Sequence, residues 1–591
     1  MAVIHRSSSS NDDKSASHNN AAYDTEKSGA PYGVDNHHDH GYGEEQPAGH
    51  IRGIETSAET SLHRGLKARH ITMIAIGGAI GTGLIIGTGK ALAQAGPGSV
   101  FISYTIVGFI VFLVMAALGE MAAWLPMSAG FTGYASRFCD PSLGFALGWS
   151  YWFKYIIVTP NQLTAAALVI QYWLPRDKVN PGVWIAIFLV IIVSINYFGI
   201  RFFGEFEFWL SSFKVIVVIG VMILTLVIAL GGAPDHDRRG FRYWQDPGAF
   251  KPYIKDGSAG RFLGFWSTMV TATFAYLGTE LLTFYRILFF YVISVVLIGM
   301  CVPYNSEDLV FANSQANSAA ASPFVVAIQN AKINALDHIL NACILVFVFS
   351  AANSDLYIAS RTLYGLASDG SAPAIFRKTN KNGVPVPALA LSACFGCLGF
   401  MNVSSNSATV FGYFVNLTTI FGLMTWISIL VTHIWWCRAR QAQGLTNAQL
   451  PYVAPLGIYG SYGALFMCIL IALTKNYDVF VGDFKTKYAT FITGYLGIPV
   501  YLIAIFGHKT YLYLKNGKVW PKGVSPTRPT STRARMLLIA RRRPSWPTRR
   551  LARRRGARML GASSTGDSCL GSSRAIGVHI DGALSLYHLP R

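Results

Sequence analysis

Glycine is concentrated in one otherwise apolar segment, Ile76-Gly-Gly-Ala-Ile-Gly-Thr-Gly-Leu84. Each glycine destabilises a helix by about 1 kcal/mol relative to alanine, so this segment is poorly suited to a continuous helix. Glycine does suit a backbone that approaches another group closely or leaves the helical conformation. Two interpretations remain open: a broken membrane helix whose freed N–H groups hold a carboxylate, or close packing through small residues. No strand is predicted before the segment, as a dinucleotide-binding loop would require.

A second apolar segment, Phe274-Ala-Tyr-Leu-Gly-Thr-Glu280, is also interrupted by glycine and ends in an acid. Short or glycine-broken segments in matching places of two halves indicate a binding site between inverted repeats. The two segments belong to the first and sixth apolar runs of the chain, which open two units of five runs each. The sequence therefore predicts one binding site to which both segments contribute.

Charged residues inside apolar runs are the next candidates for chemistry, because a charge at mid-membrane costs about 2.5–3.5 kcal/mol on insertion scales. A desolvated Lys214 is able to titrate or to take the place of a coupling cation, unless it extends to the membrane surface. Glu280 is a candidate proton acceptor or partner of a substrate ammonium. Lys154 is a candidate partner for a second substrate carboxylate or for an internal acid. Glu120 and Asp355 also lie in apolar runs, Glu120 at an end where it suits the membrane surface.

Composition indicates that lipid surrounds most of the chain. Of the 591 residues, 52% are hydrophobic and 13% are charged, whereas soluble domains carry about 25% charged residues. A helix needs about 20 apolar residues to cross the hydrocarbon core, and open sheets cannot satisfy their edges in lipid. The apolar runs predict an all-α membrane protein with twelve transmembrane helices, over residues 71–93, 98–124, 143–173, 182–199, 208–231, 262–282, 284–303, 337–360, 385–402, 408–433, 457–474 and 488–507.

The net charge of +20 is carried mainly by the C-terminal end, where residues 509–591 contain 18 Lys or Arg and two Asp. The basic pI therefore describes a tail and does not indicate nucleic-acid binding by a folded domain. We predict three regions: a disordered N-terminal tail over 1–62, a transmembrane domain over 63–510 and a basic, disordered tail over 511–591. Lys and Arg in the short flanks of the apolar runs predict that both tails are cytoplasmic.

The C-terminal tail has two open interpretations. It carries the runs Arg541-Arg-Arg543 and Arg553-Arg-Arg555 among Pro, Ser and Thr. A polybasic segment after a last transmembrane helix suits binding to anionic lipid. Alternatively, the segment is an artefact of the gene model, from a shifted reading frame or a retained intron.

Several longer motifs resemble the fungal amino-acid permeases of the amino acid–polyamine–organocation superfamily. The resemblance covers roughly residues 62–522, and features around Gly240-Phe-Arg-Tyr-Trp244 and Thr164–Trp173 favour the dicarboxylic amino-acid permease branch. The motifs that carry it are Leu66–Gly83, Gly119-Glu-Met-Ala122, Gly278-Thr-Glu280, Val302-Pro-Tyr-Asn305 and Asn353–Arg361.

The resemblance implies a LeuT-type fold of 5+5 inverted repeats with two extra helices. It also implies proton-coupled import of amino acids, acidic or broad in range, at the plasma membrane, with no cofactor or metal beyond the proton gradient and no enzymatic activity. Lys214 and Glu280 would couple the proton, since Lys214 resembles a fifth-helix lysine of proton-coupled relatives. The substrate would be bound by Ile80, Gly81, Thr82, Gly83, Phe274, Ala275, Gly278, Thr279 and Glu280.

One departure from the family pattern stands out. Family members continue past Gly-Thr-Glu with the second half of the sixth helix, an Ala- and Glu-rich end and a basic loop. Here Glu280-Leu-Leu282 runs directly into Thr283-Phe-Tyr-Arg286. Three functions therefore remain: a proton/amino-acid symporter, an amino-acid sensor that does not transport, and a non-functional variant that lacks half of a helix. The identity of the substrate and the oligomeric state are left open by the sequence.

Overall fold

Helices make up all the regular structure that the computed structural model describes. It describes residues 83–127, 129–198, 200–278, 284–307, 309, 322–404, 407–481, 484–516 and 519. These residues all belong to one structural unit, Met1–Arg528. The predicted tail over 1–62 and most of the tail over 511–591 lie outside the described residues, so both remain predictions.

Nine helical segments in the described part of the chain are long and apolar enough to cross a membrane. These are α3 Pro97–Trp124, α5 Pro141–Ile170, α6 Pro181–Phe198, α7 Ile200–Ala229, α12 Leu336–Ser368, α13 Val386–Gly396 with η5 Cys397–Val403, α14 Ser407–Ala442, α15 Gly457–Thr474 with α16 Asp478–Val481, and α17 Phe484–Tyr495 with α18 Gly497–Lys515. The all-α membrane fold is confirmed.

The count of twelve spans is not confirmed, although helices occupy the other three predicted positions. These helices are α2 Thr88–Ala95 after the π-helical turn η1 Gly83–Gly87, α8 Gly257–Ala275, and α9 Phe284–Cys301. Several predicted boundaries were wrong: α7 begins at Ile200 rather than 208, and α8 ends at Ala275 rather than 282. The structure also has short helices that the sequence reading missed, α4 Gly130–Phe138 and α11 Pro323–Asn330.

Local sequence explains where the long helices begin. Pro97 and Pro141 stand in the first turns of α3 and α5, where a missing N–H costs no helical hydrogen bond. Asp140 caps α5, because its Oδ1 accepts a hydrogen bond from the backbone N–H of Ser142 at 2.7 Å. The same carboxylate forms an ion pair through Oδ2 with Lys509 of α18 at 3.0 Å.

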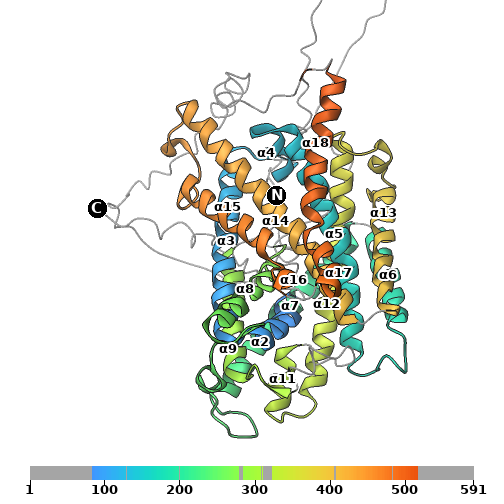
Figure 1. Cartoon of the computed structure of the whole chain (residues 1–591). Helices are drawn as coiled ribbons and strands as arrows, with labels where there is room; N and C mark the ends of the chain where they lie inside the picture. The colour runs from blue at the N-terminus through green and yellow to red at the C-terminus, as the bar shows by residue number, and fades with distance from the viewer. Residues whose placement is uncertain are drawn as a thin grey trace, which may run out of the picture. The chain divides into compact units, whose positions relative to one another are not determined.

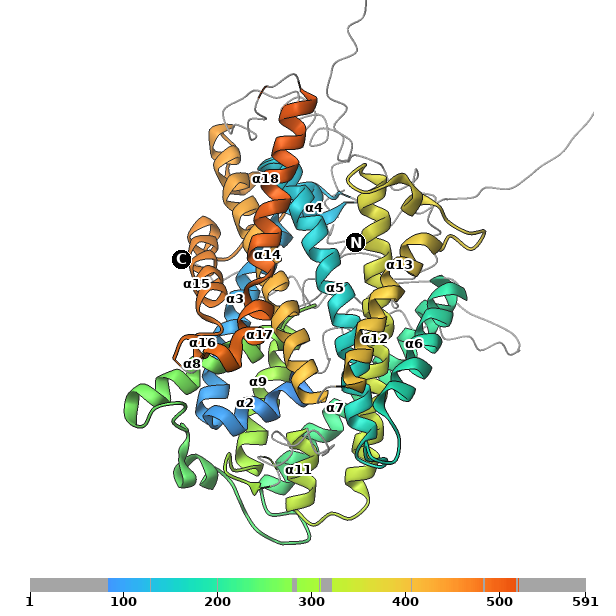
Figure 2. The same ribbon diagram turned by 45° about the vertical axis from the view of Figure 1, so that its right-hand side comes forward.

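Helix α5 lies at the centre of the domain. Its most apolar window is 94% buried by protein, against 17% for the window in α17 and α18. Figures 1 and 2 both show α5 running alongside α12, and these two helices share the most extensive contact of the domain. Leu163 of α5 and Leu356 of α12 belong to one buried cluster that also includes side chains of α6 and α13.

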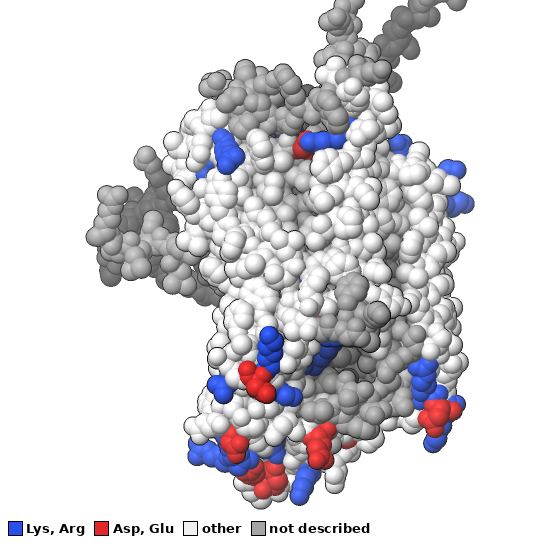
Figure 3. All heavy atoms as spheres, viewed as in Figure 1, with Lys and Arg blue, Asp and Glu red and all other residues white. Residues whose placement is uncertain are grey.

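The outer surface shows the pattern expected of a protein in a bilayer. In Figure 3, Lys, Arg, Asp and Glu gather towards two opposite ends of the face shown, and a broad band with few charges separates them. Large apolar side chains are exposed on the outer helices, among them Trp209 and Ile216 of α7 and Phe506 of α18. Such side chains would be unfavourable in water and are suited to lipid.

The central packing predicts a contrast between two leucines. Leu356→Ala should destabilise the protein by about 2–5 kcal/mol, because it leaves a cavity in a closely packed core. Leu502→Ala should change stability little, since Leu502 of α18 is 45% exposed towards the lipid side. Thermal melting of the purified protein, followed by size-exclusion chromatography, measures both. Equal melting temperatures for the two variants would contradict the central place given to α5 and α12.

Candidate functional site

The two glycine-broken segments predicted from the sequence meet in the structure. A Cβ atom placed on Gly83 would lie 2.4 Å from the Cα of Ala275, closer than real atoms allow. The backbone at the start of η1 therefore packs directly against the backbone at the end of α8. Glycine at position 83 is explained by this close approach. We call this contact the Gly83–Ala275 crossing.

Both segments of the crossing, η1 and the end of α8, depart from regular α-helical geometry. Residues Gly83–Gly87 form a π-helical turn, a feature often found at functional sites. Helix α8 ends at Ala275, and Gly278 has φ +95°, a left-handed conformation that glycine adopts without strain. The end of α8 and the conformation of Gly278 agree with the expected break in the sixth apolar run. The residues before Gly83, where the break in the first run is expected, lie outside the described residues, so that break stays a prediction.

Tyrosine hydroxyl groups satisfy backbone carbonyls at the crossing. The hydroxyl of Tyr291 on α9 donates a hydrogen bond to the carbonyl of Ala275 at 2.7 Å. The hydroxyl of Tyr104 on α3 donates to the carbonyl of Gly83 at 3.4 Å. The rings of these two tyrosines also pack against the buried ring of Tyr276. Hydrogen bonds from tyrosines of α3 and α9 thus hold the two segments of the crossing.

Part of the predicted substrate site lies outside the described residues. This applies to Ile80, Gly81, Thr82, Thr279 and Glu280, whose roles stay predictions. Among the described candidates, Gly83 and Ala275 lie in direct contact. Phe274 is buried, and its ring packs edge-on against Phe411 of α14 at 6.2 Å between centroids.

Lys214 is completely buried near the middle of α7. It does not extend to the membrane surface, and its nearest acids are Glu207 on the same helix and Asp355 on α12. Glu207 precedes Lys214 by seven residues, a spacing that places both side chains on one face of a helix. A buried charge requires such partners, because desolvation of an isolated ion is very costly.

Glu207 accepts hydrogen bonds from side chains of both α7 and α12. Its Oε1 accepts hydrogen bonds from the hydroxyls of Ser211, at 3.3 Å, and Ser350. Its Oε2 accepts from the side-chain amide of Asn353 at 3.3 Å. The sequence reading missed Glu207. The seven-residue spacing to Lys214 was a usable signal, but the nearby Glu205 made the choice of acid ambiguous.

Four charged side chains belong to one electrostatic network, which we call the mid-membrane charge network: the buried Lys154 of α5, the buried Glu207 and Lys214 of α7, and the partly buried Asp355 of α12. Asp355 interacts electrostatically with the other three and with the side chain of Gln162. Two positive and two negative charges make the network formally neutral. Arg361, which follows Asp355 in the sequence, lies instead over the ring of Tyr357 and donates to the carbonyl of Gly383.

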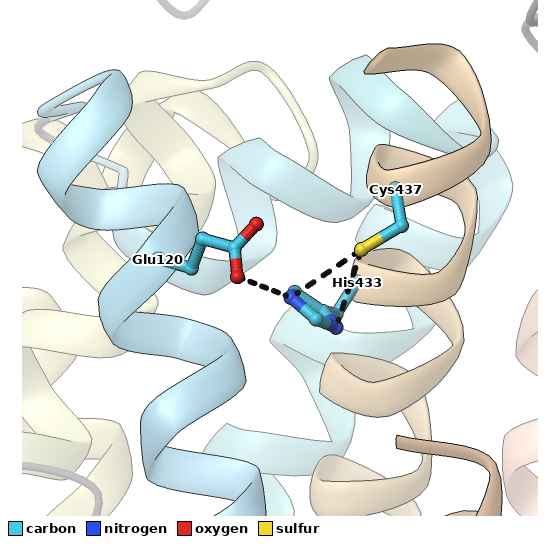
Figure 4. A group of neighbouring side chains, drawn as sticks. All are labelled: Glu120, His433 and Cys437. Carbon is cyan, nitrogen blue, oxygen red and sulfur yellow. Dashed lines mark hydrogen bonds and ion pairs between the residues drawn. The ribbon is translucent and has the colours of Figure 1, made fainter. Parts of the chain in front are cut away.

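A separate polar cluster surrounds Glu120 at the end of α3 (Figure 4). The side chain of Glu120 is buried rather than exposed at a membrane surface. Its Oε1 pairs with Arg440 at 3.0 Å, and its Oε2 accepts from the backbone N–H of Ala454 at 2.8 Å. His433 lies 3.4 Å from the same carboxylate through Nε2. The Glu120 cluster thus joins α3 to α14 and to the segment before α15.

Glu120, His433 and Cys437 could be read as a metal site, because their ligand atoms lie within 4.8 Å of one another. The chemistry favours an anchoring role. Arg440 already neutralises the carboxylate, and His433 Nδ1 is hydrogen-bonded to the hydroxyl of Ser461 at 2.8 Å. The sulfur of Cys437 lies 3.9 Å from Nδ1 and 3.7 Å from Nε2 of His433. It therefore lies over the side of the imidazole ring and does not share a metal position with one ring nitrogen.

These features define a polytopic helical membrane protein with interrupted helices and a buried charge network at its centre. The sequence model of the amino acid permease family matches residues 70–284 and 281–520. The chain therefore belongs to the amino acid permease family. The two matched segments overlap at residues 281–284. This is the place where the sequence departs from the family pattern.

Similar proteins come from several fungi. The dicarboxylic amino acid permease of Saccharomyces cerevisiae is 57% identical over 472 residues, covering 76% of this chain and 77% of that protein. An amino-acid permease of Schizosaccharomyces pombe is 46% identical, covering 76% of this chain and 89% of that protein. The proline-specific permease of Emericella nidulans is 40% identical, covering 77% and 86%.

The crossing predicts that Gly83 does not tolerate a side chain. Gly83→Ala should lower the melting temperature of the purified protein, because its methyl group would push apart η1 and α8. Gly365→Ala on α12 is the matched control, since a Cβ there meets nothing within 4 Å. In an open helical position the change to alanine stabilises by about 1 kcal/mol. A Gly83→Ala protein as stable as the control would show that the close approach is absent.

The anchoring role of Glu120 predicts a strong effect of its arginine partner. Arg440→Met should destabilise the protein by about 3–5 kcal/mol, because it leaves a buried carboxylate without its charged partner. Arg438→Met should have little effect, since Arg438 is exposed and donates a hydrogen bond to the hydroxyl of Tyr462. Thermal melting with added zinc or chelator gives a further readout. A zinc-dependent rise in melting temperature would favour the metal site over the anchor.

Proposed function

We propose that this permease domain imports amino acids, acidic or broad in range, across the plasma membrane by proton symport. The family match supports an amino-acid importer, and the dicarboxylic permease relative at 57% identity supports acidic substrates. Lys and Arg in the short flanks of the apolar runs support an orientation with both ends of the chain in the cytoplasm. The observation that carries most weight is the meeting of the two broken segments at the Gly83–Ala275 crossing.

In this proposal the substrate is bound beside the crossing. The N–H groups of the glycine-rich segment around Gly81 and Thr82 would hold its α-carboxylate. Gly278 and Glu280 would lie on the side of its ammonium group. Lys214 would take the place of a coupling cation, and the mid-membrane charge network would receive the proton. Rocking of one group of helices against another would then give access from each side in turn.

A second candidate function rests on the junction between α8 and α9. The family match divides at residues 281–284, and α9 begins at Phe284 soon after α8 ends at Ala275. The family pattern that the sequence resembles has the second half of the sixth helix and a basic loop at this place. Without these parts, Glu280 would be shifted from mid-membrane towards an interface. The chain would then be a variant of a permease with impaired transport.

Uptake of labelled glutamate, glutamine and arginine in cells that lack their own permeases tests both candidates. The chain as it stands is compared with a version in which the missing segment of the sixth helix is restored from a relative. We expect the restored version to accumulate glutamate in a manner that a protonophore abolishes. We expect the chain as it stands to be slower by on the order of 100-fold, because small misplacements of binding groups have effects of that size.

The outcomes separate the candidates. Equal uptake by both versions would show that the segment is dispensable and would remove the second candidate. Uptake that is insensitive to the protonophore would contradict proton symport. Stabilisation of both versions by amino acids without uptake would instead indicate a sensor that binds and does not transport.

A further inference from the structure

The outer surface carries an apolar groove where the last four helices of the described chain meet. It lies between the end of α15, the short helix α16, helix α17 and the start of α18. Its volume of about 530 Å³ is in the range of pockets that hold a small organic ligand. We call it the α15–α18 groove, and its lining includes Leu473, Phe480, Phe491, Ile492, Tyr495 and Pro499.

Aromatic rings form one wall of the groove. The ring of Phe480 meets that of Phe491 edge-on at 5.8 Å between centroids, and Phe491 packs against Tyr495 at 5.2 Å. Phe491 and Tyr495 are four residues apart on α17, so they share one face of that helix. The hydroxyl of Tyr495 donates to the carbonyl of Leu473 at 2.9 Å, which ties α17 to α15. The wall is therefore held in place by contacts within the protein.

The groove opens on the lipid side of the domain. Helices α17 and α18 form one of the candidate membrane spans, and only 17% of its most apolar window is covered by protein. Phe480 is 65% exposed and Ile492 is 51% exposed. Such side chains would be unfavourable in water, so the molecule that fills the groove comes from the bilayer.

One end of the groove is polar. Asp478 stands two residues before Phe480 on α16, and Lys487 stands one helical turn before Phe491 on α17. The ammonium of Lys487 donates to the backbone carbonyl of Asp478 at 3.1 Å and lies 3.8 Å from its carboxylate. Both side chains are partly exposed. An ammonium has more than one donor and a carboxylate has several acceptor positions, so a hydroxyl group is able to bond with both.

We propose that the α15–α18 groove binds a membrane sterol, with its rings against the aromatic wall and its hydroxyl at Lys487 and Asp478. The acid beside the base distinguishes a sterol from a phospholipid. A neutral hydroxyl accepts from Lys487 and donates to Asp478, whereas a phosphate would be repelled by the carboxylate. A rigid ring system also loses less conformational freedom on binding than a flexible acyl chain does.

A sterol in the groove contacts α15 and α16 on one side and α17 and α18 on the other. Because it binds the folded domain, it stabilises the protein as its share of the bilayer rises. The groove contains no residue of the Gly83–Ala275 crossing or of the mid-membrane charge network. The inference is therefore independent of the proposed function.

Photolabelling of the purified full chain in nanodiscs tests the proposal. The nanodiscs contain phosphatidylcholine with or without ergosterol, and the probe is a sterol that carries a photoactivatable diazirine on its ring system. We expect the label on peptides from residues 473–499, and we expect ergosterol to compete with it. The methyl ether of ergosterol cannot donate to Asp478, so it should compete about tenfold more weakly, as for a lost hydrogen bond to a charged group.

Two variants and a matched control locate the site. Ile492→Trp fills the groove from an exposed position, so it should abolish both the labelling and the rise in melting temperature that ergosterol produces in the parent chain. Lys487→Met removes the donor at the polar end and should weaken labelling about tenfold. Ile216→Trp on α7 is the control, because Ile216 is 69% exposed and lies outside the groove. It should be labelled like the parent chain.

Four results would overturn the sterol site. Labelling that Ile492→Trp leaves unchanged, or that spreads evenly over the outer helices, would show that the groove does not select the sterol. Competition by phosphatidic acid as strong as that by ergosterol would show that a phospholipid fills the groove. Disulfide cross-linking of two copies through Ile492→Cys would show that a second copy covers it. Each of these results leaves the proposed function standing.

Discussion

A helix that ends inside a membrane leaves carbonyl groups with no water to bind, and this constraint organises the centre of the permease. Helix α8 ends at Ala275, and its carbonyl is satisfied by the hydroxyl of Tyr291 from α9. At the other segment of the crossing, the hydroxyl of Tyr104 from α3 donates to the carbonyl of Gly83, the first residue of η1, at 3.4 Å. The end of α8 can therefore persist inside the domain, where it packs against the start of η1.

Electroneutrality is the second constraint. The mid-membrane charge network contains two lysines and two acids from three helices, and none of these residues can be changed alone without leaving a charge uncompensated. Electrostatic attraction between these groups also favours the packing of α5 and α7 against α12. The Glu120 cluster shows a similar balance at the end of α3, where Arg440 compensates the carboxylate. In the mid-membrane charge network, Oδ2 of Asp355 has no hydrogen-bond donor among the described residues, so it can accept a proton or a ligand. Both carboxylate oxygens of Glu120 have partners, so the Glu120 cluster is suited to anchoring.

The sequence predicted the class of fold well, because apolar runs of sufficient length have few alternatives to membrane helices. It also singled out Gly83, Lys154, Lys214 and Asp355 as candidates, since glycines and charges stand out in apolar surroundings, while Ala275 was implied by the family resemblance; their roles stay predictions. It could not pair residues that are distant in the chain. His433 and Arg440 meet Glu120 through tertiary packing, and no local pattern encodes that contact. The end of α8 was placed too late, because Leu281 and Leu282 extend the apolar run beyond Gly278, where the helical geometry is already lost.

The unequal burial of the helices separates two kinds of surroundings. Almost all of α5 touches protein, whereas α17 and α18 are largely exposed on the outer surface. A change in bilayer thickness or lipid composition acts directly on α17 and α18. It reaches α5 only through intervening contacts, such as that between Lys509 and Asp140 at the first turn of α5. The buried groups of α5 are thus insulated from the lipid, while the outer helices are free to respond to it.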